Sequence, residues 1–303
     1  MIEVLEPGPA AYVEDLGRPG CAGLGLGRSG AADRGALARA NRLLGNRPDA
    51  AAVEVTLGGL RVRFDSDHVV ALTGAPAPST LAGVPVAGDA VLRAGRGDVL
   101  ELGLPPRGLR TYLAVRGGIA VPPVLGSRSW DVLAQLGPAP LQAGDLLPVG
   151  LPPALGPVAE RLFRRMPGAG VPADVEVHGT GGCAVVEVVP GQRTEWFARQ
   201  AWETFLSAPY QVAPDSNRVA LRLDGAAVPR AQRGEYASEG LVRGAVQVPP
   251  SGDPVVFLVD HPVTGGYPVL AVVTPPGADA LAQLRPGDDV RFRPARDALL
   301  TAS

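Results

Sequence analysis

The segment from Gly234 to Pro268 places its polar side chains at the ends of short apolar runs, where a β scaffold usually presents its chemistry. Carboxylate and imidazole groups, which often move protons in enzymes, occur here together with an amide and hydroxyls. The residues concerned are Ser238, Glu239, Arg243, Gln247, Asp260, His261, Thr264 and Tyr267. The sequence therefore makes this segment the first candidate for a functional site.

A glycine pair, Gly265-Gly266, lies between Thr264 and Tyr267-Pro268 in the same segment. Glycine adopts backbone conformations that other residues avoid, and it lets a neighbouring group approach closely. The turn could therefore offer its backbone to a ligand. The alternative is a hairpin-rich piece of a β barrel with ordinary turn residues.

A second candidate is the run Gly126-Ser-Arg-Ser-Trp-Asp131, which follows the glycine pair Gly117-Gly118. Hydroxyl groups can donate to an anion, and a guanidinium can bind one with two parallel hydrogen bonds. The groups in question belong to Ser127, Arg128 and Ser129. The alternative is a plain helix start, capped by one of the two serines.

Three glycines near the N-terminus, Gly25, Gly27 and Gly30, match the G-x-G-x-x-G spacing of dinucleotide-binding loops. We reject that fold, because no buried strand leads into the motif and no alternation of strands and helices follows it. The motif is common by chance, so it carries no nucleotide-binding prediction.

A helix is predicted from Asp33, because Leu37 and Ala40 lie on one apolar face and Asp33 can cap its N-terminus. Asn41 lies off that face, so we expect it in solvent, or else facing a ligand beside the glycine-rich loop. Gly30, Asp33 and Asn41 therefore form a possible site between the loop and the helix.

All 28 basic residues are arginine, and the chain contains no lysine. The chain therefore cannot carry biotin on a lysine, form a Schiff base or supply the lysine of a Walker-type phosphate loop. Any ATP site of that type must belong to a partner. Arginine remains well suited to binding carboxylate or phosphate groups.

Other composition features narrow the class of protein. A net charge of −2 gives no electrostatic reason to expect nucleic acid or an anionic membrane as a partner. Cys21 and Cys183 stand far apart, so neither a metal site nor a disulfide framework is supported. The N-terminal residues lack a signal-peptide pattern, and no apolar run approaches the length of a membrane span. We therefore expect a soluble cytoplasmic protein.

The 40 glycines and 32 prolines are mixed with valine, leucine and alanine, which indicates many tight turns between strands. The sequence predicts a mostly β protein with two β-rich domains and a few short helices. The N-terminal domain is expected over residues 1–150, a Pro/Gly-rich connecting segment over 151–174 and the C-terminal domain over 175–303.

Three local patterns give sharper expectations. Val53–Phe64 alternates around a Gly-Gly pair and predicts a β-hairpin. Arg193–Phe205 predicts one short amphipathic helix. Leu281–Phe292 predicts a short helix, a Pro-Gly turn and a closing strand.

Several motifs, in order along nearly the whole chain, resemble those of the KipA/PxpC family, also called allophanate hydrolase subunit 2 or the biotin-dependent carboxyltransferase family. The matching blocks are Ser29–Asp33 with Ala40–Asn46, Gly117-Gly118 with Gly126–Ser129, Ser238–Gly240 with Gly244–Pro250, Thr264–Pro268 and Gln283–Asp288. Trp130 departs from the family, which commonly has threonine there.

The resemblance implies a cyclophilin-like barrel in the C-terminal domain and a KipI/PxpB-like partner subunit. With a LamB/YcsF-like third protein, such pairs are associated with ATP-dependent 5-oxoprolinase, which opens 5-oxoproline to glutamate. The expected function is therefore a subunit of this amidohydrolase, active only with partners and using ATP bound with or by a partner.

Site roles follow from residue type and motif position. Arg128 and Arg218 are expected to hold the anionic groups of substrate and intermediate, with donors from Ser127, Ser129 and the Thr264–Tyr267 turn. Glu239 or Asp260 could act as general base, and His261 as proton carrier. Gln247 is a further substrate-binding candidate, and no metal ligand is expected.

Two alternatives stay open. Related chains form the carboxyltransferase half of urea carboxylase in urea amidolyases, where biotin would be carried by another chain. The KipA name comes from a regulatory role, so a non-catalytic antagonist of a KipI-like kinase inhibitor is the other alternative.

Overall fold

The computed structural model describes residues 1–154, 183–232 and 237–295. The chain divides into two compact units. The described residues of unit 1 are Met1–Arg18, Asp33–Trp130 and 135–154. Those of unit 2 are Pro19–Ala32, Asp131–Ala134, 183–232 and 237–295. Most of the expected connecting segment, 151–174, lies outside the described residues, so the domain boundaries stay a prediction.

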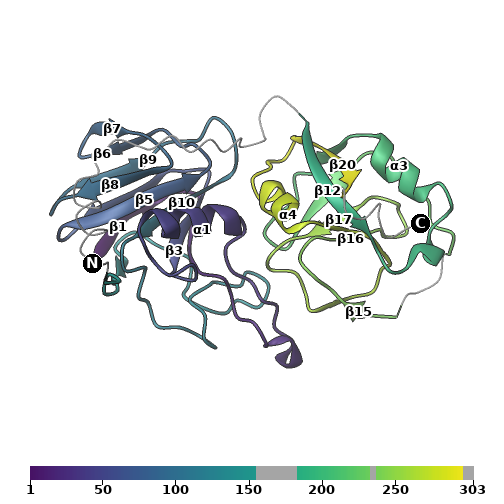
Figure 1. The fold of residues 1–303 in the computed structure, drawn as a ribbon, viewed down its shortest axis with the longest axis horizontal. Helices are drawn as coiled ribbons and strands as arrows, with labels where there is room; N and C mark the ends of the chain where they lie inside the picture. Colours follow the sequence, from purple (N-terminus) through teal and green to yellow (C-terminus); the bar gives the residue numbers. More distant parts are fainter. Residues whose placement is uncertain (155–182, 233–236, 296–303) are drawn as a thin grey trace. The chain divides into compact units, whose positions relative to one another are not determined.

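The described residues of unit 1 form two β-sheets (Figure 1). The first has the strand order β11 (Leu146–Leu147), β1 (Ile2–Pro7), β4 (Leu60–Phe64), β9 (Val99–Leu102), β6 (Ser79–Leu81) and β7 (Val84–Val86). The second has the order β2 (Ala10–Glu14), β3 (Ala52–Thr56), β10 (Arg110–Val115), β5 (His68–Gly74) and β8 (Ala90–Ala94). Buried residues of both sheets form one apolar core.

The predicted hairpin over Val53–Phe64 is wrong, although both strands exist. β3 pairs with β2 and β10, whereas β4 pairs with β1 and β9 in the other sheet. Three consecutive residues with left-handed backbone, Leu57 to Gly59, turn the chain from one sheet to the other. Both strands direct alternate apolar side chains into the shared core, which a hairpin pattern cannot distinguish from crossing between sheets.

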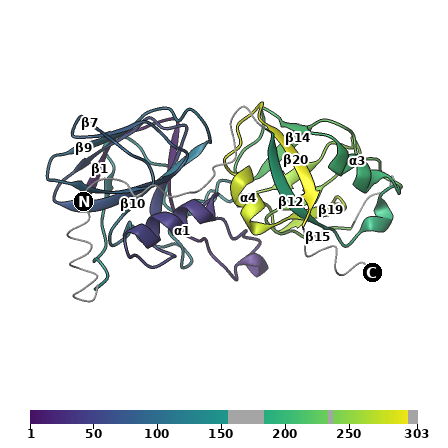
Figure 2. The same cartoon turned by 45° about the horizontal axis from the view of Figure 1, so that its top comes forward.

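Helix α1 (Arg34–Leu43) packs on β5 and β10 of the second sheet (Figures 1 and 2). Its expected N-cap is confirmed, because the Asp33 side chain accepts a hydrogen bond from the Ala36 amide at 2.8 Å. The buried face includes Leu37 and Ala40, as predicted, but it also includes Asn41. This helix covers the face of the sheet that carries Tyr112.

Unit 2 contains a closed barrel of seven strands among its described residues. Their order is β12 (Ala184–Pro190), β19 (Val269–Val273), β16 (Ala245–Gln247), β17 (Val255–Phe257), β14 (Ala220–Asp224), β13 (Tyr210–Val212) and β20 (Asp289–Pro294). A separate two-stranded sheet joins β15 (Glu239–Gly240) to β18 (Thr264–Gly265). The expected mostly β fold with a C-terminal barrel is therefore confirmed.

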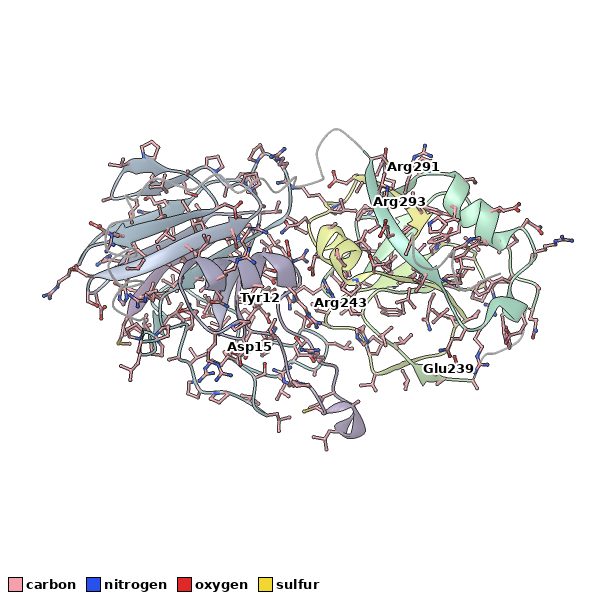
Figure 3. All side chains as sticks on the ribbon, viewed as in Figure 1. Tyr12, Asp15, Glu239, Arg243, Arg291 and Arg293 are labelled. Carbon is pink, nitrogen blue, oxygen red and sulfur yellow. The ribbon has the colours of Figure 1, made fainter. Side chains whose placement is uncertain are left out.

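Parallel pairing of β12 with β20 closes the barrel. Along β20 the side chains of Val290 and Phe292 are buried, whereas Arg291 and Arg293 face outward (Figure 3). This two-residue period is the one expected of a strand with a single buried face. Helix α3 (Ala201–Ser207) packs on β20 and helix α4 (Pro275–Leu281) on β12 (Figure 2).

Two predicted helices differ in extent. Arg193–Phe205 is not one helix, because a 3-10 turn (Thr194–Trp196) is separated from α3 by Phe197, which bridges to Arg230 as in a strand pair. The closing helix ends at Leu281 rather than starting there, whereas the following turn and strand are confirmed. A further 3-10 turn is formed by Ala22–Leu24. No helix in the described ranges is long and apolar enough to cross a membrane.

A buried polar network fixes α1 to the second sheet. The Tyr112 hydroxyl donates to Glu54 Oε2 at 2.6 Å and accepts the Asp33 amide at 2.8 Å. Arg110 Nε lies 3.3 Å from the other Glu54 oxygen. Burial, followed by the charges of Glu54 and Asp33, raises the pKa of Tyr112 well above its ordinary value. The neutral phenol is therefore the form that folding favours.

We predict that Tyr112→Phe lowers the free energy of unfolding near neutral pH by about 1–3 kcal/mol, because two buried polar groups lose their partner. Since the folded pKa is raised, the contribution of the phenol is complete below about pH 10 and declines as pH rises above the unfolded-state value. Urea titrations followed by circular dichroism should show the gap between wild type and variant narrowing above that pH.

The control is Tyr267→Phe, which changes an exposed tyrosine in unit 2. This variant should follow the wild-type pH profile. A gap between wild type and Tyr112→Phe that stays constant from neutral pH to alkaline pH would contradict the assigned cause.

Candidate functional site

Asp260 is the centre of a buried polar cluster in unit 2, and its side chain is 0% exposed. One carboxylate oxygen accepts the Ser29 hydroxyl at 2.5 Å. The other accepts Arg218 Nε at 2.8 Å and the Val132 amide at 3.3 Å. One carboxylate therefore joins residues from three distant parts of the sequence, and its oxygens are directed at protein groups rather than at solvent.

Arg218 also holds the backbone of the glycine-rich segment. Its Nη2 donates to the Gly30 carbonyl at 2.8 Å, and its side chain is 5% exposed. The preceding residue, Ser29, is fully buried and has a left-handed backbone with φ of 56°. Non-glycine residues adopt this conformation only when their surroundings hold them there. The bonds to Asp260 and Arg218 supply that constraint.

A second arginine fixes the next turn of the same segment. Arg243 Nη2 donates to the Ala32 carbonyl at 2.7 Å and pairs with Asp279 Oδ1 at 2.6 Å. Ala32 itself packs against Val259 and Ala282. Segment 19–32 is therefore a built-in part of unit 2, although it lies near the N-terminus of the sequence.

His261 follows the central aspartate and contacts the same segment. Its Nδ1 lies 2.7 Å from the Pro262 carbonyl, which assigns the proton to Nδ1 and the lone pair of the neutral ring to Nε2. A Cβ atom at Gly27 would lie 2.7 Å from the His261 carbonyl oxygen, so only glycine fits there. The ring is half-buried and packs edge-on against Phe257 at 6.4 Å.

Gln247 supports the glycine turn from the barrel. Its side chain is 3% exposed, and its Nε2 donates to the Tyr267 carbonyl at 2.7 Å. A Cβ atom at Gly265 would lie 2.6 Å from that nitrogen, which explains the glycine at this position. Thr264, Gly266 and Tyr267 are exposed. The turn is thus fixed from beneath and accessible from outside.

Glu239 lies on the short sheet beside this turn, paired in register with Gly265. Its Oε1 accepts Arg193 Nε at 2.8 Å and also contacts Arg193 Nη2. The side chain is 34% exposed, in contrast with that of Asp260. Of the two carboxylates predicted as a general base, only Glu239 can be reached from solvent in this arrangement.

The predicted Gly-Ser-Arg-Ser motif lies in unit 1, where it surrounds Asp15. Asp15 Oδ1 accepts both hydroxyls, from Ser127 and Ser129, at 2.7 Å each. Asp15 Oδ2 accepts the Arg128 amide at 2.6 Å. The hydroxyl protons are thus directed to a carboxylate of the chain itself, and the serines do not cap a helix, because the chain continues as turns.

The three residues of the possible site between loop and helix, Gly30, Asp33 and Asn41, all make hydrogen bonds within the chain. Asn41 is 0% exposed, so the expectation that it is solvated is wrong. Its Nδ2 donates to the Ala50 carbonyl at 2.8 Å, and its Oδ1 accepts Asn46 Nδ2 at 3.1 Å. Asp33 caps α1, and Gly30 belongs to unit 2. These contacts fix the chain after α1.

The predicted site residues therefore fall into two groups. One group, in unit 2, is Gly30, Arg218, Glu239, Gln247, Asp260, His261, Thr264, Gly265, Gly266 and Tyr267, and the other, in unit 1, is Asp33, Asn41, Ser127, Arg128 and Ser129. Sequence reasoning missed Ser29 and Asp15 as participants, because their partners are remote in the chain. The described residues contain no cluster of His, Cys, Asp or Glu that could hold a metal ion.

Comparison with known proteins defines the class. The family model "Carboxyltransferase domain, subdomain A and B" matches residues 24–294, and the chain therefore belongs to this family. A 5-oxoprolinase subunit of Escherichia coli K12 is 36% identical over 96% of this chain and 90% of its own length. The protein of the same name from Haemophilus influenzae is 32% identical with the same coverage.

Longer proteins contain a similar region. The urea amidolyase of Lachancea kluyveri is 32% identical over 96% of this chain but only 17% of its own length. The crystal structure of TTHA0988 superposes with a TM-score of 0.83 at 36% identity, over 96% of this chain and 55% of that one. The urea amidolyase of K. lactis gives a TM-score of 0.85 at 29% identity, over 97% of this chain and 18% of that one.

We predict that Asp260→Asn and Arg218→Met each lower the free energy of unfolding of unit 2 by about 3–5 kcal/mol, because each leaves a buried charge without its partner. The double variant should lose less than the sum of the two, because neither charge remains. Chemical denaturation of all three variants measures the coupling.

The matched control is the exposed pair Arg222–Asp215, which has the same 2.8 Å separation with exposures of 59% and 65%. Arg222→Met and Asp215→Asn should each cost less than about 1 kcal/mol. Equal losses for the buried and the exposed pair would contradict the importance assigned to burial.

We further predict that Asp15→Asn lowers the free energy of unfolding of unit 1 by about 2–4 kcal/mol, because an amide cannot accept all the hydrogen bonds that the carboxylate accepts. Asp253→Asn, at an exposed position, is the control and should be close to neutral. Limited proteolysis should cut near Ser127 faster in the Asp15 variant, and an unchanged pattern with unchanged stability would refute this role.

Proposed function

We propose that this chain is one subunit of an ATP-dependent 5-oxoprolinase that converts 5-oxoproline to glutamate, acting with a KipI/PxpB-like subunit and a LamB/YcsF-like protein. The observation that carries the proposal is the sequence identity of 36% and 32% to two 5-oxoprolinase subunits. The chain aligns over 90% of the length of the 5-oxoprolinase subunits but over less than a fifth of the urea amidolyases.

The reaction requires activation of an unreactive lactam. ATP can phosphorylate the lactam oxygen and leave as ADP. Water then adds to the ring carbon, and the C–N bond breaks to give a ring-opened acyl phosphate. A second water hydrolyses this acyl phosphate to glutamate and inorganic phosphate. The attacking water needs a base and the leaving nitrogen needs a proton. Glu239 is the candidate base because its carboxylate is partly exposed beside the accessible Thr264–Tyr267 turn. His261 is the candidate proton carrier because its half-buried imidazole lies beside the glycine-rich segment and its Nδ1 is held by the Pro262 carbonyl.

Asp260 and Arg218 are assigned a positioning role rather than direct contact with substrate. Both are buried, and their bonds hold Ser29 and Gly30 in place. The backbone of Gly265 and Gly266 and the side chains of Thr264 and Tyr267 would supply donors to substrate oxygens. Gln247 acts through the turn that it supports.

ATP is assigned to a partner or to a site shared with one. The chain has no lysine for a Walker-type loop, so it cannot hold the phosphates in that way by itself. The same absence means that biotin, in any carboxylation reaction, would be carried by another chain.

The decisive experiment mixes this chain with its two proposed partners and ATP, with and without 5-oxoproline, and measures glutamate and ADP together. We expect stoichiometric glutamate that disappears when this chain is omitted. Glutamate formed without this chain would refute the proposal. A stable complex that binds tightly but produces no glutamate would favour the regulatory alternative.

Glu239→Gln tests the assigned base within that assembly. We expect kcat to fall by about 10²–10⁴-fold with the complex intact, because the base no longer accepts the proton. Glu195→Gln, at an exposed position of the same unit, is the matched control. Full activity of the Glu239 variant would remove Glu239 from the mechanism.

Carboxyl transfer from a partner's carboxybiotin is the second candidate, supported by the TM-score of 0.85 with the K. lactis urea amidolyase. Avidin blotting of proteins that co-purify with this chain distinguishes the two. A biotinylated partner, together with no oxoprolinase activity, would favour carboxyl transfer.

A further inference from the structure

Unit 1 contains a cavity of about 490 Å³. This volume lies within the range typical of small-molecule sites, about 300–1,000 Å³. Much of its wall is backbone from the turns around Gly117-Gly118 and Gly150-Leu151, and the charged side chains that line it are Arg47, Asp49 and Arg128. The bonds that fix this wall and these side chains decide what the cavity can bind.

The glycine wall is rigid. A Cβ atom at Gly117 would lie 2.2 Å from the Gly150 carbonyl oxygen, and one at Gly150 would lie 2.5 Å from the Gly117 oxygen. The Gly150 amide donates to the Gly118 carbonyl at 3.0 Å, and the Gly117 amide donates to Asn46 Oδ1 at 2.9 Å. Only glycines allow this approach, and the hydrogen bonds then hold the wall without side chains filling the cavity.

Hydrogen bonds within the chain fix the backbone amide and the Nε atom of Arg128. Its amide donates to Asp15 Oδ2 at 2.6 Å, and its Nε donates to the Val121 carbonyl at 2.7 Å. Within the described part of the chain, neither Nη atom donates to a protein group. The buried Asp15 cluster therefore orients a guanidinium whose two terminal nitrogens are available to a ligand in the cavity.

The charges of the cavity favour an anion. Arg47 pairs with Asp49 at 3.0 and 2.9 Å, and both side chains are largely exposed, so this pair can open at little cost. The pKa of Asp49 is lowered, mainly by the hydrogen bond from Arg47 and also by the charge of Arg128. Two guanidinium groups against one carboxylate leave a net positive charge at the cavity.

We propose that this cavity binds the oxyanion group of a small molecule, a carboxylate or a phosphate, through two parallel hydrogen bonds from Arg128. The planar guanidinium matches both groups, and its fixed Nε removes part of the ordering cost of binding. The proposal rests on the oxoprolinase function in giving a place to the anionic group that Arg128 is expected to hold, and binding to this chain alone can be measured separately from turnover by the assembly.

Isothermal titration calorimetry on the full chain tests the site with 5-oxoproline and glutamate in one arm and inorganic phosphate and ADP in the other. We expect saturable binding in at least one arm, and the arm that binds identifies the source of the oxyanion. Arg128→Gln should weaken that binding at least about tenfold, equivalent to about 1.4 kcal/mol. Arg107→Gln, at an exposed position of unit 1, is the charge-matched control and should bind as wild type.

Asp49→Asn provides an independent variant that keeps Arg128 in place. Removing the competing carboxylate should tighten anion binding, whereas a merely structural role of the cavity residues predicts no change. No saturable binding in either arm would overturn the proposal. Undiminished binding by a folded Arg128→Gln, or weaker binding by Asp49→Asn, would overturn it as well.

Discussion

The buried ion pair between Arg218 and Asp260 is the interaction on which the candidate site in unit 2 depends. An unpaired charge in this environment would cost several kcal/mol, so the two residues fix each other. Asp260 also accepts hydrogen bonds from the Ser29 hydroxyl and the Val132 amide, and Arg218 donates one to the Gly30 carbonyl. The ion pair therefore holds in place two segments, around Ser29 and around Val132, that are far from the barrel in sequence.

Unit 1 also has a buried carboxylate that holds a loop in place, but its partners are hydroxyls and backbone amides rather than an arginine. Asp15 is a buried carboxylate satisfied by two serine hydroxyls and two backbone amides, including that of Gly17. Each of these donors adds a hydrogen bond that holds the carboxylate in place. The result is a rigid Gly-Ser-Arg-Ser loop whose arginine is oriented before any ligand arrives. Hydroxyls that looked like ligand donors in the sequence are therefore the means of positioning Arg128.

Sequence patterns predicted where helices and strands form better than they predicted which strands pair and which residues a buried side chain contacts. The cap of α1 by Asp33 was predictable because it depends on residues within one turn. The strands over Val53–Phe64 were predictable, but their sheets were not, because alternation is the same whether a turn closes a hairpin or passes between sheets. Asn41 was misjudged since a buried amide is identified by the carbonyls around it, which come from a later loop.

The sequence by itself determined the class of protein. Its turn-rich composition predicted a β fold, its motifs matched one family in order, and the lack of lysine excluded whole mechanisms. Tertiary structure decided which polar groups are available for chemistry. Whether a hydroxyl, carboxylate or guanidinium is free or already satisfied depends on hydrogen bonds between residues up to 231 positions apart, as between Ser29 and Asp260. Such bonds are set by packing, so no local spacing records them.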